Sequence, residues 1–295
     1  MNSAVQPLET LFEQAQGQAL PLPEELLTLY GLLQFPLQPG KPYIVGNFVS
    51  TLDGVVSLNI PGQAGGGPIS GESVHDHLVM GLLRAVADAV IVGAGTLRAV
   101  SPEHRWTAAY IYPDLRDVYQ QLRLRLGKPE PPLNVIVTAS GELDLDQPLF
   151  QSGEVPVLIV TTAQGAARLD ARCIPPAVRV ASVYERGFLS ATAMVQAVCA
   201  ARPCQLLLVE GGPQVLRAFL AEGLLDELFL TLAPQIAGRD AETSRPALVE
   251  GQRFAPEHPL WGALIGVKRG GNHLFFRYAF PTQNGKEISH RWSLH

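Results

Sequence analysis

The apolar positions of this chain fall into two kinds of segment that alternate along the sequence. Short runs rich in Val, Ile and Leu show little alternation with polar residues, which is typical of strands buried on both faces of a sheet. Between them, apolar residues recur every three or four positions, as one face of a helix requires. This alternation predicts βαβ units and an α/β fold with helices on both faces of the sheet. The expected strands are Tyr43–Val49, Ala89–Val92, Asn134–Thr138, Pro156–Val160, Val178–Val183, Gln205–Val209 and Glu227–Leu232, and the expected helices are Ser73–Ala87, Leu115–Leu126, Ala163–Asp170, Ser190–Ala201 and Pro213–Glu222.

The first part of the chain does not follow this alternation. Residues 1–40 predict a helical N-terminal extension, with helical patterns over Leu8–Ala15 and Glu24–Leu33. Several prolines interrupt it and separate the two expected helices.

The other end of the chain predicts a hairpin. Two apolar segments, Ala263–Val267 and His273–Phe280, flank the turn-forming residues Lys268-Arg269-Gly270-Gly271-Asn272. We therefore expect a mixed sheet that is mostly parallel and ends in an antiparallel C-terminal edge. The main domain is expected over residues 41–281, followed by a polar tail over residues 282–295.

The segment from Ser73 shows how the sequence specifies one helix. Ser73 can cap the helix, and Asp76 follows three residues later, as in a relative of the capping box. Arg84 lies off the expected apolar stripe, and its spacing alone is as consistent with a solvated surface arginine as with a functional one. The stripe consists of Val74, Leu78, Leu82, Ala85 and Val86.

Composition and charge narrow the classes of function. The 295 residues are 47% hydrophobic and 17% charged, as in an ordinary globular protein. With a formal net charge of -5 and no run of Lys or Arg, nucleic acid is not an expected partner. No apolar stretch approaches the ~20 residues that span a bilayer, and the first residues do not resemble a signal peptide. We expect no membrane partner and a cytoplasmic location.

Metal and disulfide chemistry are not expected from the spacing of the possible ligands. The three cysteines, Cys173, Cys199 and Cys204, form no CxxC or CxxH pattern. His75 and His77 lie two residues apart, on different sides of the expected helix. We predict reduced thiols and no metal site.

Three glycine-containing turns follow three of the expected strands. They are Ser50-Thr51-Leu52-Asp53-Gly54, Gly93-Ala94-Gly95-Thr96 and Glu210-Gly211-Gly212-Pro213. In an open α/β sheet, ligands bind outside the carboxyl ends of the strands, so we expect these turns to line one crevice. Glycine lets the backbone approach a pyrophosphate closely, and Pro213 suits the first turn of a helix. The simpler alternative is that these glycines only form tight turns.

The turns match neither the GxGxxG fingerprint nor a P-loop, so we expect a dinucleotide site of another architecture. Thr138 and Ser140 follow the next strand and could bind a ribose 2′-phosphate. Thr161 and Thr162 end the strand after that and could lie near an adenosine. Hydroxyl groups at strand ends are also ordinary turn residues.

Asp53 and Glu210 are the carboxylates at these strand ends. A carboxylate in a crevice can donate or relay a proton, or accept hydrogen bonds from a polar substrate. Asp before Gly is also a frequent turn pair, which is the structural alternative, but the neighbouring glycine turns favour a functional role for Asp53.

Three blocks of sequence together resemble a known family. They are Pro42–Val45 with Ser50–Gly54, then Leu82–Ala85 with Asp88–Thr96, and finally Val209–Pro213 with Phe219-Leu220, Leu225–Glu227, Ala233-Pro234 and Gly238. The family is the reductase domain of bacterial riboflavin-biosynthesis deaminase/reductases, within the dihydrofolate-reductase-like fold. The resemblance covers roughly residues 42–280.

The resemblance implies a cofactor, a substrate and their contacts. NADPH would reduce the ribosylamino group of a pyrimidine phosphate to a ribitylamino group, and the enzyme would be a homodimer. Arg84 and Glu210 match substrate-contacting positions, and Asp53 is the candidate for substrate orientation or proton relay. The residues expected to bind NADPH are Ser50, Gly93, Gly95, Thr96, Thr138, Ser140, Thr162, Gly211, Gly212, Pro213 and Val215.

The chain departs from the family near the expected substrate. The family carries a Lys in its opening strand and a Trp in the following segment, which here reads Gly65-Gly66-Gly67-Pro68-Ile69-Ser70. The segment Val100–Thr107 keeps only the proline of the family's “D-(D/N)-P-x-L-T-x-R” pattern. The zinc signature of the deaminase domain is also missing.

These observations lead to one leading function and two alternatives. The leading function is NADPH-dependent reduction of a pyrimidine-type heterocycle, with 5-amino-6-(5-phosphoribosylamino)uracil as the expected substrate. The altered segments keep open a reductase of another heterocycle, such as dihydrofolate or a dihydropteridine. The third hypothesis is a non-catalytic nucleotide-binding module of the same fold.

Overall fold

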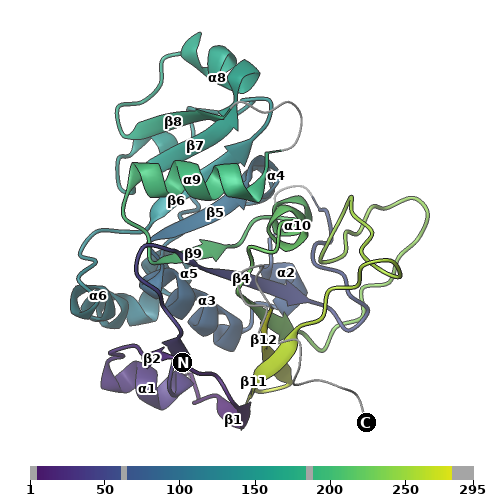
Figure 1. The fold of residues 1–295 in the computed structure, drawn as a ribbon. Helices are drawn as coiled ribbons and strands as arrows, with labels where there is room; N and C mark the ends of the chain where they lie inside the picture. The colour runs from purple at the N-terminus through teal and green to yellow at the C-terminus, as the bar shows by residue number, and fades with distance from the viewer. Residues whose placement is uncertain (1–4, 61–64, 184–188, 281–295) are drawn as a thin grey trace.

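The computed structural model describes residues 5–60, 65–183 and 189–280. Within these residues, ten strands form one sheet in the order β1-β11-β12-β10-β4-β9-β5-β6-β7-β8 (Figure 1). Strands β10 to β8 are parallel, and β12, β11 and β1 continue the sheet antiparallel at one edge. The predicted mixed sheet is confirmed. Its strands are β1 Glu9–Glu13, β4 Tyr43–Ser50, β5 Ala89–Gly93, β6 Leu133–Thr138, β7 Val157–Thr162, β8 Val178–Val183, β9 Leu206–Val209, β10 Glu227–Leu232, β11 Ala263–Gly270 and β12 His273–Ala279.

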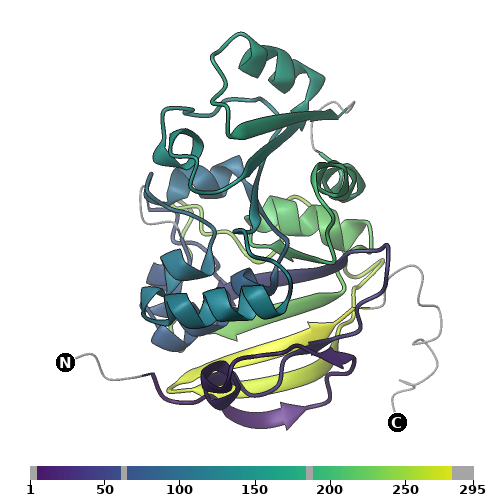
Figure 2. The same cartoon turned by 90° about the vertical axis from the view of Figure 1, so that its left-hand side faces the viewer.

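Helices cover both faces of this sheet because successive strand side chains point to opposite sides. In β5, Val90 and Val92 join one hydrophobic core, and Ala89 and Ile91 join the other. Figure 2 shows the blue helices of residues 74–125 on one side and the green helices of residues 191–221 on the other. The longer helices are α1 Glu24–Tyr30, α3 Val74–Val86, α6 Arg116–Arg125, α8 Ala163–Asp170, α9 Ala191–Ala201 and α10 Pro213–Ala221, and the short ones are α2 Gly67–Ser70, α4 Ala94–Ala99, α5 Ala108–Ile111, η1 Pro113–Leu115 and α7 Pro148–Gln151.

Helix α3 confirms the predicted cap and most of the predicted stripe. The Ser73 hydroxyl accepts a hydrogen bond from the Asp76 amide at 3.4 Å. Leu78 and Leu82 are fully buried, whereas Val74 is 48% exposed, because the first turn of the helix projects beyond the core. The stripe therefore begins at Leu78.

The predicted helix over Leu8–Ala15 is wrong. The chain forms the edge strand β1 there, which pairs antiparallel with β11. The edge of β11 offers unpaired backbone groups, and this tertiary pairing outweighs the weak helical preference of a short segment. The second expected helix is confirmed as α1. The strands on either side of it, β2 Gln18–Ala19 and β3 Gln34–Phe35, pair in a separate two-stranded sheet.

The N-terminal segment packs on the main core. Leu22, Leu26 and Leu33 of this segment belong to the same buried cluster as Leu78 of α3. The division at residue 40 stays a prediction about domains, but residues 5–40 share one hydrophobic core with the helices and strands of the main sheet.

The predicted C-terminal hairpin is confirmed with a shorter turn. Strand β11 extends to Gly270, which pairs with His273, so only Gly271 and Asn272 form the turn. Gly271 has a φ of 59°, a conformation that costs glycine little and that two-residue hairpin turns require. The structure does not describe residues 281–295, so the predicted polar tail lies outside the described residues.

A buried ion pair lies where the antiparallel edge meets the parallel sheet. Arg277 of β12 and Glu227 of β10 form a salt bridge of 2.7 Å, and their side chains are 3% and 2% exposed. The Tyr43 hydroxyl donates to the other oxygen of Glu227 at 2.8 Å. The Arg277 guanidinium also lies 4.7 Å from the centre of the Phe229 ring.

None of the helices in the described part of the chain is long and apolar enough to cross a lipid bilayer.

Candidate functional site

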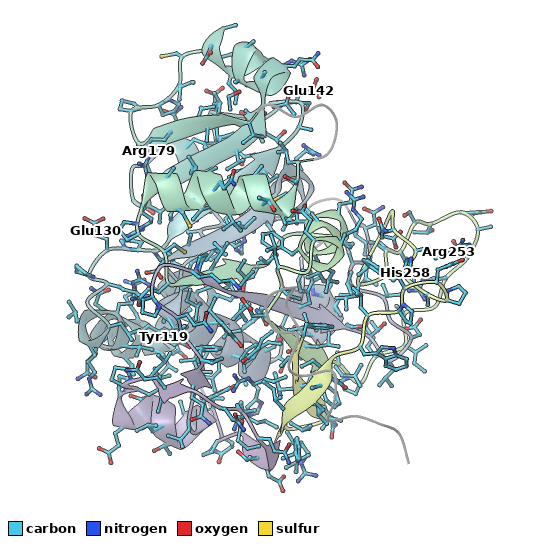
Figure 3. The ribbon with its side chains drawn as sticks, in the orientation of Figure 1. Tyr119, Glu130, Glu142, Arg179, Arg253 and His258 are labelled. Atoms are coloured by element: carbon cyan, nitrogen blue, oxygen red, sulfur yellow. The ribbon has the colours of Figure 1, made fainter. Side chains whose placement is uncertain are left out.

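A cleft of about 1190 Å³ lies at the carboxyl ends of four adjacent strands, β4, β9, β5 and β6. This is where ligands bind in open α/β sheets. Its walls come from these strand ends, from α3 and α4, and from the long segment between β10 and β11. That segment carries Arg253 and His258 (Figure 3) and adds Ser244, Pro246 and Glu250 to the wall. The volume exceeds what one small ligand needs, so the cleft has room for a dinucleotide beside a substrate.

Two of the predicted glycine turns meet in this cleft. A Cβ atom on Gly212 would lie 3.4 Å from the Thr96 hydroxyl, and one on Gly93 would lie 3.2 Å from Val215. The turns after β5 and β9 therefore pack side by side. A Cβ on Gly211 would come within 2.7 Å of Val215, so only glycine fits there without a shift.

Gly95 is exposed and meets nothing within 4 Å at the position of a Cβ atom. Gly212 caps α10, and Pro213 occupies its first turn, as predicted. A bare backbone at Gly95 and a helix start at Gly212 leave room for a pyrophosphate to approach, so these residues fit a dinucleotide.

The turn after β6 also lines the cleft. Thr138 accepts a hydrogen bond from the Gly141 amide at 3.2 Å, and Ser140 accepts one from the Glu142 amide at 3.2 Å. Both side chains contribute to the cleft wall. Each hydroxyl keeps its proton for donation to a ligand.

Thr162 is placed differently from Thr138 and Ser140. Its hydroxyl caps α8 by accepting from the Gly165 amide at 3.1 Å, and it donates to the Ala139 carbonyl at 2.8 Å. It is not among the described residues that line the cleft. Its geometry supports the structural alternative, and contact with an adenosine stays a prediction.

A buried charged pair forms the floor of the cleft. Arg84 Nε donates to Glu210 Oε2 at 2.8 Å, and the two side chains are 3% and 5% exposed. Asn47 donates to the other Glu210 oxygen at 3.0 Å. A solvated Arg84 is thus excluded, because α3 turns this flank toward the end of β9. Arg84 also donates at 3.5 Å to the carbonyls of Arg105 and Thr107, which ties α3 to the loop that departs from the family.

The first predicted turn, Ser50–Gly54, does not line the cleft. The Ser50 hydroxyl is buried and donates to the Thr51 carbonyl at 2.9 Å. The Asp53 carboxylate accepts from the Thr51 hydroxyl at 2.6 Å and from the amides of Ala237 and Gly238 at 3.1 and 2.7 Å. Neither residue is among the described residues of the cleft wall, which includes Asn47–Val49 before the turn.

Asp53 is poorly suited to donate a proton in this geometry. Hydrogen bonds from the Thr51 hydroxyl and the Ala237 amide lower the pKa of Asp53 to about 2. It therefore stays ionised at neutral pH and ties the first turn to the segment after β10. The arrangement favours turn chemistry over proton relay, and any contact with substrate stays a prediction.

Asn47, Asp76 and His104 are among the polar residues of the cleft that sequence reasoning missed. Asn47 is a polar residue within an apolar strand, which is the signal that could have found it. Asp76 was assigned only to the cap of α3, yet it lines the cleft.

His104 lies in the loop that departs from the family. Its ring centre lies 4.7 Å from those of both Trp106 and Tyr110. Burial, followed by the positive charges of Arg84 and Arg105, lowers the pKa of His104 to about 3. His104 is therefore neutral at physiological pH. No local sequence pattern predicts that His104 lines the cleft, because its position there depends on the path of the whole loop.

Within residues 5–60, 65–183 and 189–280, no group of three or more His, Cys, Asp or Glu side chains is arranged to hold a metal ion. The three cysteines are free thiols.

Comparison with known proteins places this cleft in a family. The chain matches the RibD C-terminal domain over residues 42–255. It is 26% identical over 215 residues to the 2,5-diamino-6-ribosylamino-4(3H)-pyrimidinone 5′-phosphate reductase of Archaeoglobus fulgidus, an alignment that covers 72% of this chain and 89% of the relative.

Solved structures share the fold at lower identity. A pyrimidine reductase-like protein from Corynebacterium diphtheriae aligns with a TM-score of 0.63 and 23% identity, over 86% of this chain and 98% of that one. RibD of Acinetobacter baumannii aligns with a TM-score of 0.55 and 20% identity over 82% of this chain. This chain spans only 58% of that RibD chain.

The family match covers most of the chain, including both glycine turns, Arg84 and Glu210. The resemblance inferred from the sequence is thereby confirmed. This chain belongs to the RibD C-terminal domain family, whose curated members similar to it are named as reductases.

Proposed function

We propose that this protein is an NADPH-dependent reductase that converts the ribosylamino group of a pyrimidine 5′-phosphate to a ribitylamino group. The leading substrate is 5-amino-6-(5-phosphoribosylamino)uracil, and the 2,5-diamino-pyrimidinone phosphate named for the archaeal relative is its close analogue. One observation carries the proposal: the glycine turns and the buried Arg84–Glu210 pair line a single cleft.

The cofactor end of the cleft is formed by the glycine turns and the turn after β6. Gly93, Gly95 and Thr96 would hold the dinucleotide together with Gly211–Val215. Bound there, a reduced nicotinamide supplies the hydride. The hydroxyl groups of Thr138 and Ser140 can donate to a 2′-phosphate, which is the basis for proposing NADPH over NADH.

The substrate end of the cleft is formed by Asn47, Arg84 and Glu210. Both Glu210 oxygens are held by hydrogen bonds, so this carboxylate presents a fixed negative charge to a polar heterocycle. Arg98 and Arg217 also line the cleft and provide positive charge for a phosphate. The role of these chain groups is to bind and orient the substrate and to exclude water.

The assay that tests the function compares two substrates with the purified protein. We expect oxidation of NADPH with the ribosylaminouracil phosphate and none with dihydrofolate. Turnover of dihydrofolate or a dihydropteridine alone would contradict the proposal in favour of another heterocycle. NADPH binding without turnover of any of them would indicate a non-catalytic module.

We expect Gly95→Leu to weaken NADPH binding at least tenfold without destabilising the fold. A Cβ atom at this exposed position has no neighbour within 4 Å, and the rest of the leucine side chain would project into the space that the pyrophosphate needs. Leucine favours α4 more than glycine does, so the thermal midpoint should not fall. NADPH titration by fluorescence measures the effect, with Gly95→Ala as the graded control. Equal affinity for NADPH in the Leu variant would mean that the dinucleotide lies elsewhere.

The cytoplasmic location and the homodimeric state are also proposals, supported by the family and by the composition. Sedimentation of the purified protein tests the second of them.

A further inference from the structure

Asp76 is a buried carboxyl group that the proposed function has not yet used. It lies in the first turn of α3, is 4% exposed, and lines the cleft on the same helix as Arg84. Thr231 of β10 and Ser70 of α2 carry hydroxyl groups beside it. The carboxyl thus lies in the part of the cleft wall that α3 provides, and its charge interacts with that of Glu210 at the proposed substrate end.

Its Oδ2 atom is buried and finds no hydrogen-bond partner among the described residues. The two carboxylates at strand ends are well satisfied by contrast: Asp53 accepts three hydrogen bonds, and Glu210 is bonded through both oxygens. A buried ionised oxygen without a donor is costly, whereas a protonated oxygen needs only an acceptor, such as a bound substrate.

The surroundings of Asp76 shift its equilibrium toward the neutral acid. Burial raises the pKa of Asp76 to about 6; Glu210 adds to the increase, and Thr231, His77 and Ser70 oppose it. His77 also lies 3.6 Å from Glu72 in the turn before α3, so its own positive charge is partly compensated when it is protonated. A substrate with a negative phosphate would favour the neutral acid further.

We propose that Asp76 is the catalytic proton donor of the reduction, an inference that rests on the proposed function. In that reaction a hydride from the reduced nicotinamide adds to C1′ of the ribosylamino group. The bond between C1′ and the ring oxygen breaks, and that oxygen takes one proton from Asp76 to become a hydroxyl group. The cofactor is left oxidised, and the Asp76 carboxylate regains a proton from solvent.

The kinetic test compares Asp76→Asn with Asp76→Glu and with a matched control. Asp226→Asn is that control, because Asp226 is a half-buried carboxyl whose pKa burial likewise raises to about 6, but it accepts a hydrogen bond from the Ile44 amide at the opposite end of the strands. For the parent protein, kcat should fall as pH rises through the pKa of Asp76, because only the neutral acid can donate.

We expect Asp76→Asn to lower kcat by about a hundredfold at pH 6 and to abolish this pH-dependent limb. Asp76→Glu should restore part of kcat and part of the pH dependence. Asp226→Asn should leave kcat and its pH dependence unchanged. NADPH affinity should stay within twofold of the parent in every variant. A kcat for Asp76→Asn within twofold of the parent, with the same pH profile, would overturn the inference while leaving the proposed function intact.

A second readout needs no turnover. In the ligand-free protein at pH 5, infrared spectroscopy should show the carbonyl absorption of protonated carboxyl groups. The component that Asp76 contributes should disappear in Asp76→Asn. Asp226→Asn should lose only the component that Asp226 contributes. Absence of any Asp76 component at pH 5 would overturn the inference by itself. If the parent protein does not reduce the pyrimidine phosphate at all, the proposed function fails, and the role of Asp76 fails with it.

Discussion

Replacing Arg84 with Met is expected to lower turnover at least a hundredfold and the free energy of unfolding by about 3 kcal/mol. The substitution keeps much of the side-chain volume but leaves the Glu210 carboxylate buried with only the Asn47 amide as a partner. It also removes one positive charge from the cleft, to which Arg98 and Arg217 contribute as well. Steady-state kinetics and urea denaturation measure the two effects on the same preparation.

The double variant Arg84→Met with Glu210→Leu separates stability from function. Replacing both members of a buried ion pair with apolar residues is often neutral or stabilising, so the double variant should recover most of the lost free energy of unfolding. Turnover should stay at least a hundredfold below the parent. Recovery of turnover together with stability would mean that the pair only supports the fold and does not contact the substrate.

Replacing Glu227 with Gln is expected to destabilise the protein by about 3 kcal/mol and to leave the cofactor affinity unchanged. The change removes the nearer of two negative charges that compensate Arg277, since Glu227 lies at 2.7 Å and Glu13 at 3.9 Å, and the Arg277 side chain is only 3% exposed. The site lies between β10 and β12, whereas the glycine turns follow β5 and β9, so NADPH should bind the folded variant normally. Urea denaturation and NADPH titration check the two parts of this prediction.

The matched control is Glu257→Gln, which removes the same charge from an exposed pair. Arg253 and Glu257 are 3.3 Å apart, but their side chains are 79% and 54% exposed (Figure 3 shows Arg253). Such pairs contribute about 0–1 kcal/mol, so this variant should unfold almost as the parent does. Equal losses for Glu227→Gln and Glu257→Gln would contradict the argument that burial makes the difference.

The prediction of the parallel sheet succeeded because each buried strand carries its signal locally. Runs such as Val157–Thr162 and Leu206–Val209 are apolar along their length, and helices separate them. The sequence signal for the hairpin at Gly271 is equally local, since the turn residues lie directly between the two strands that they join. The helix predicted over Leu8–Ala15 failed because the partner of β1 lies more than 250 residues away in sequence, at Val267 and Lys268.

The cleft was predicted in part. The turns at Gly93 and Gly211 follow strands that turn out to be neighbours, so their position at one edge follows from the topology. The turn at Asp53 also follows a central strand, but its carboxylate points to Ala237 and Gly238 instead of the cleft. Nothing in the local sequence distinguishes these two outcomes, because the partner loop comes from beyond β10.

The sequence by itself determined the class of fold, the order of most elements, the family and the glycine turns, because these depend on patterns within short segments. Only the tertiary structure decided which side chains meet. It buried Arg84 against Glu210, joined Asn47 to the same carboxylate and left Asp76 without a donor for one oxygen. These contacts join residues far apart in sequence, and the burial that sets their charge and energy exists only once the strands and helices have packed.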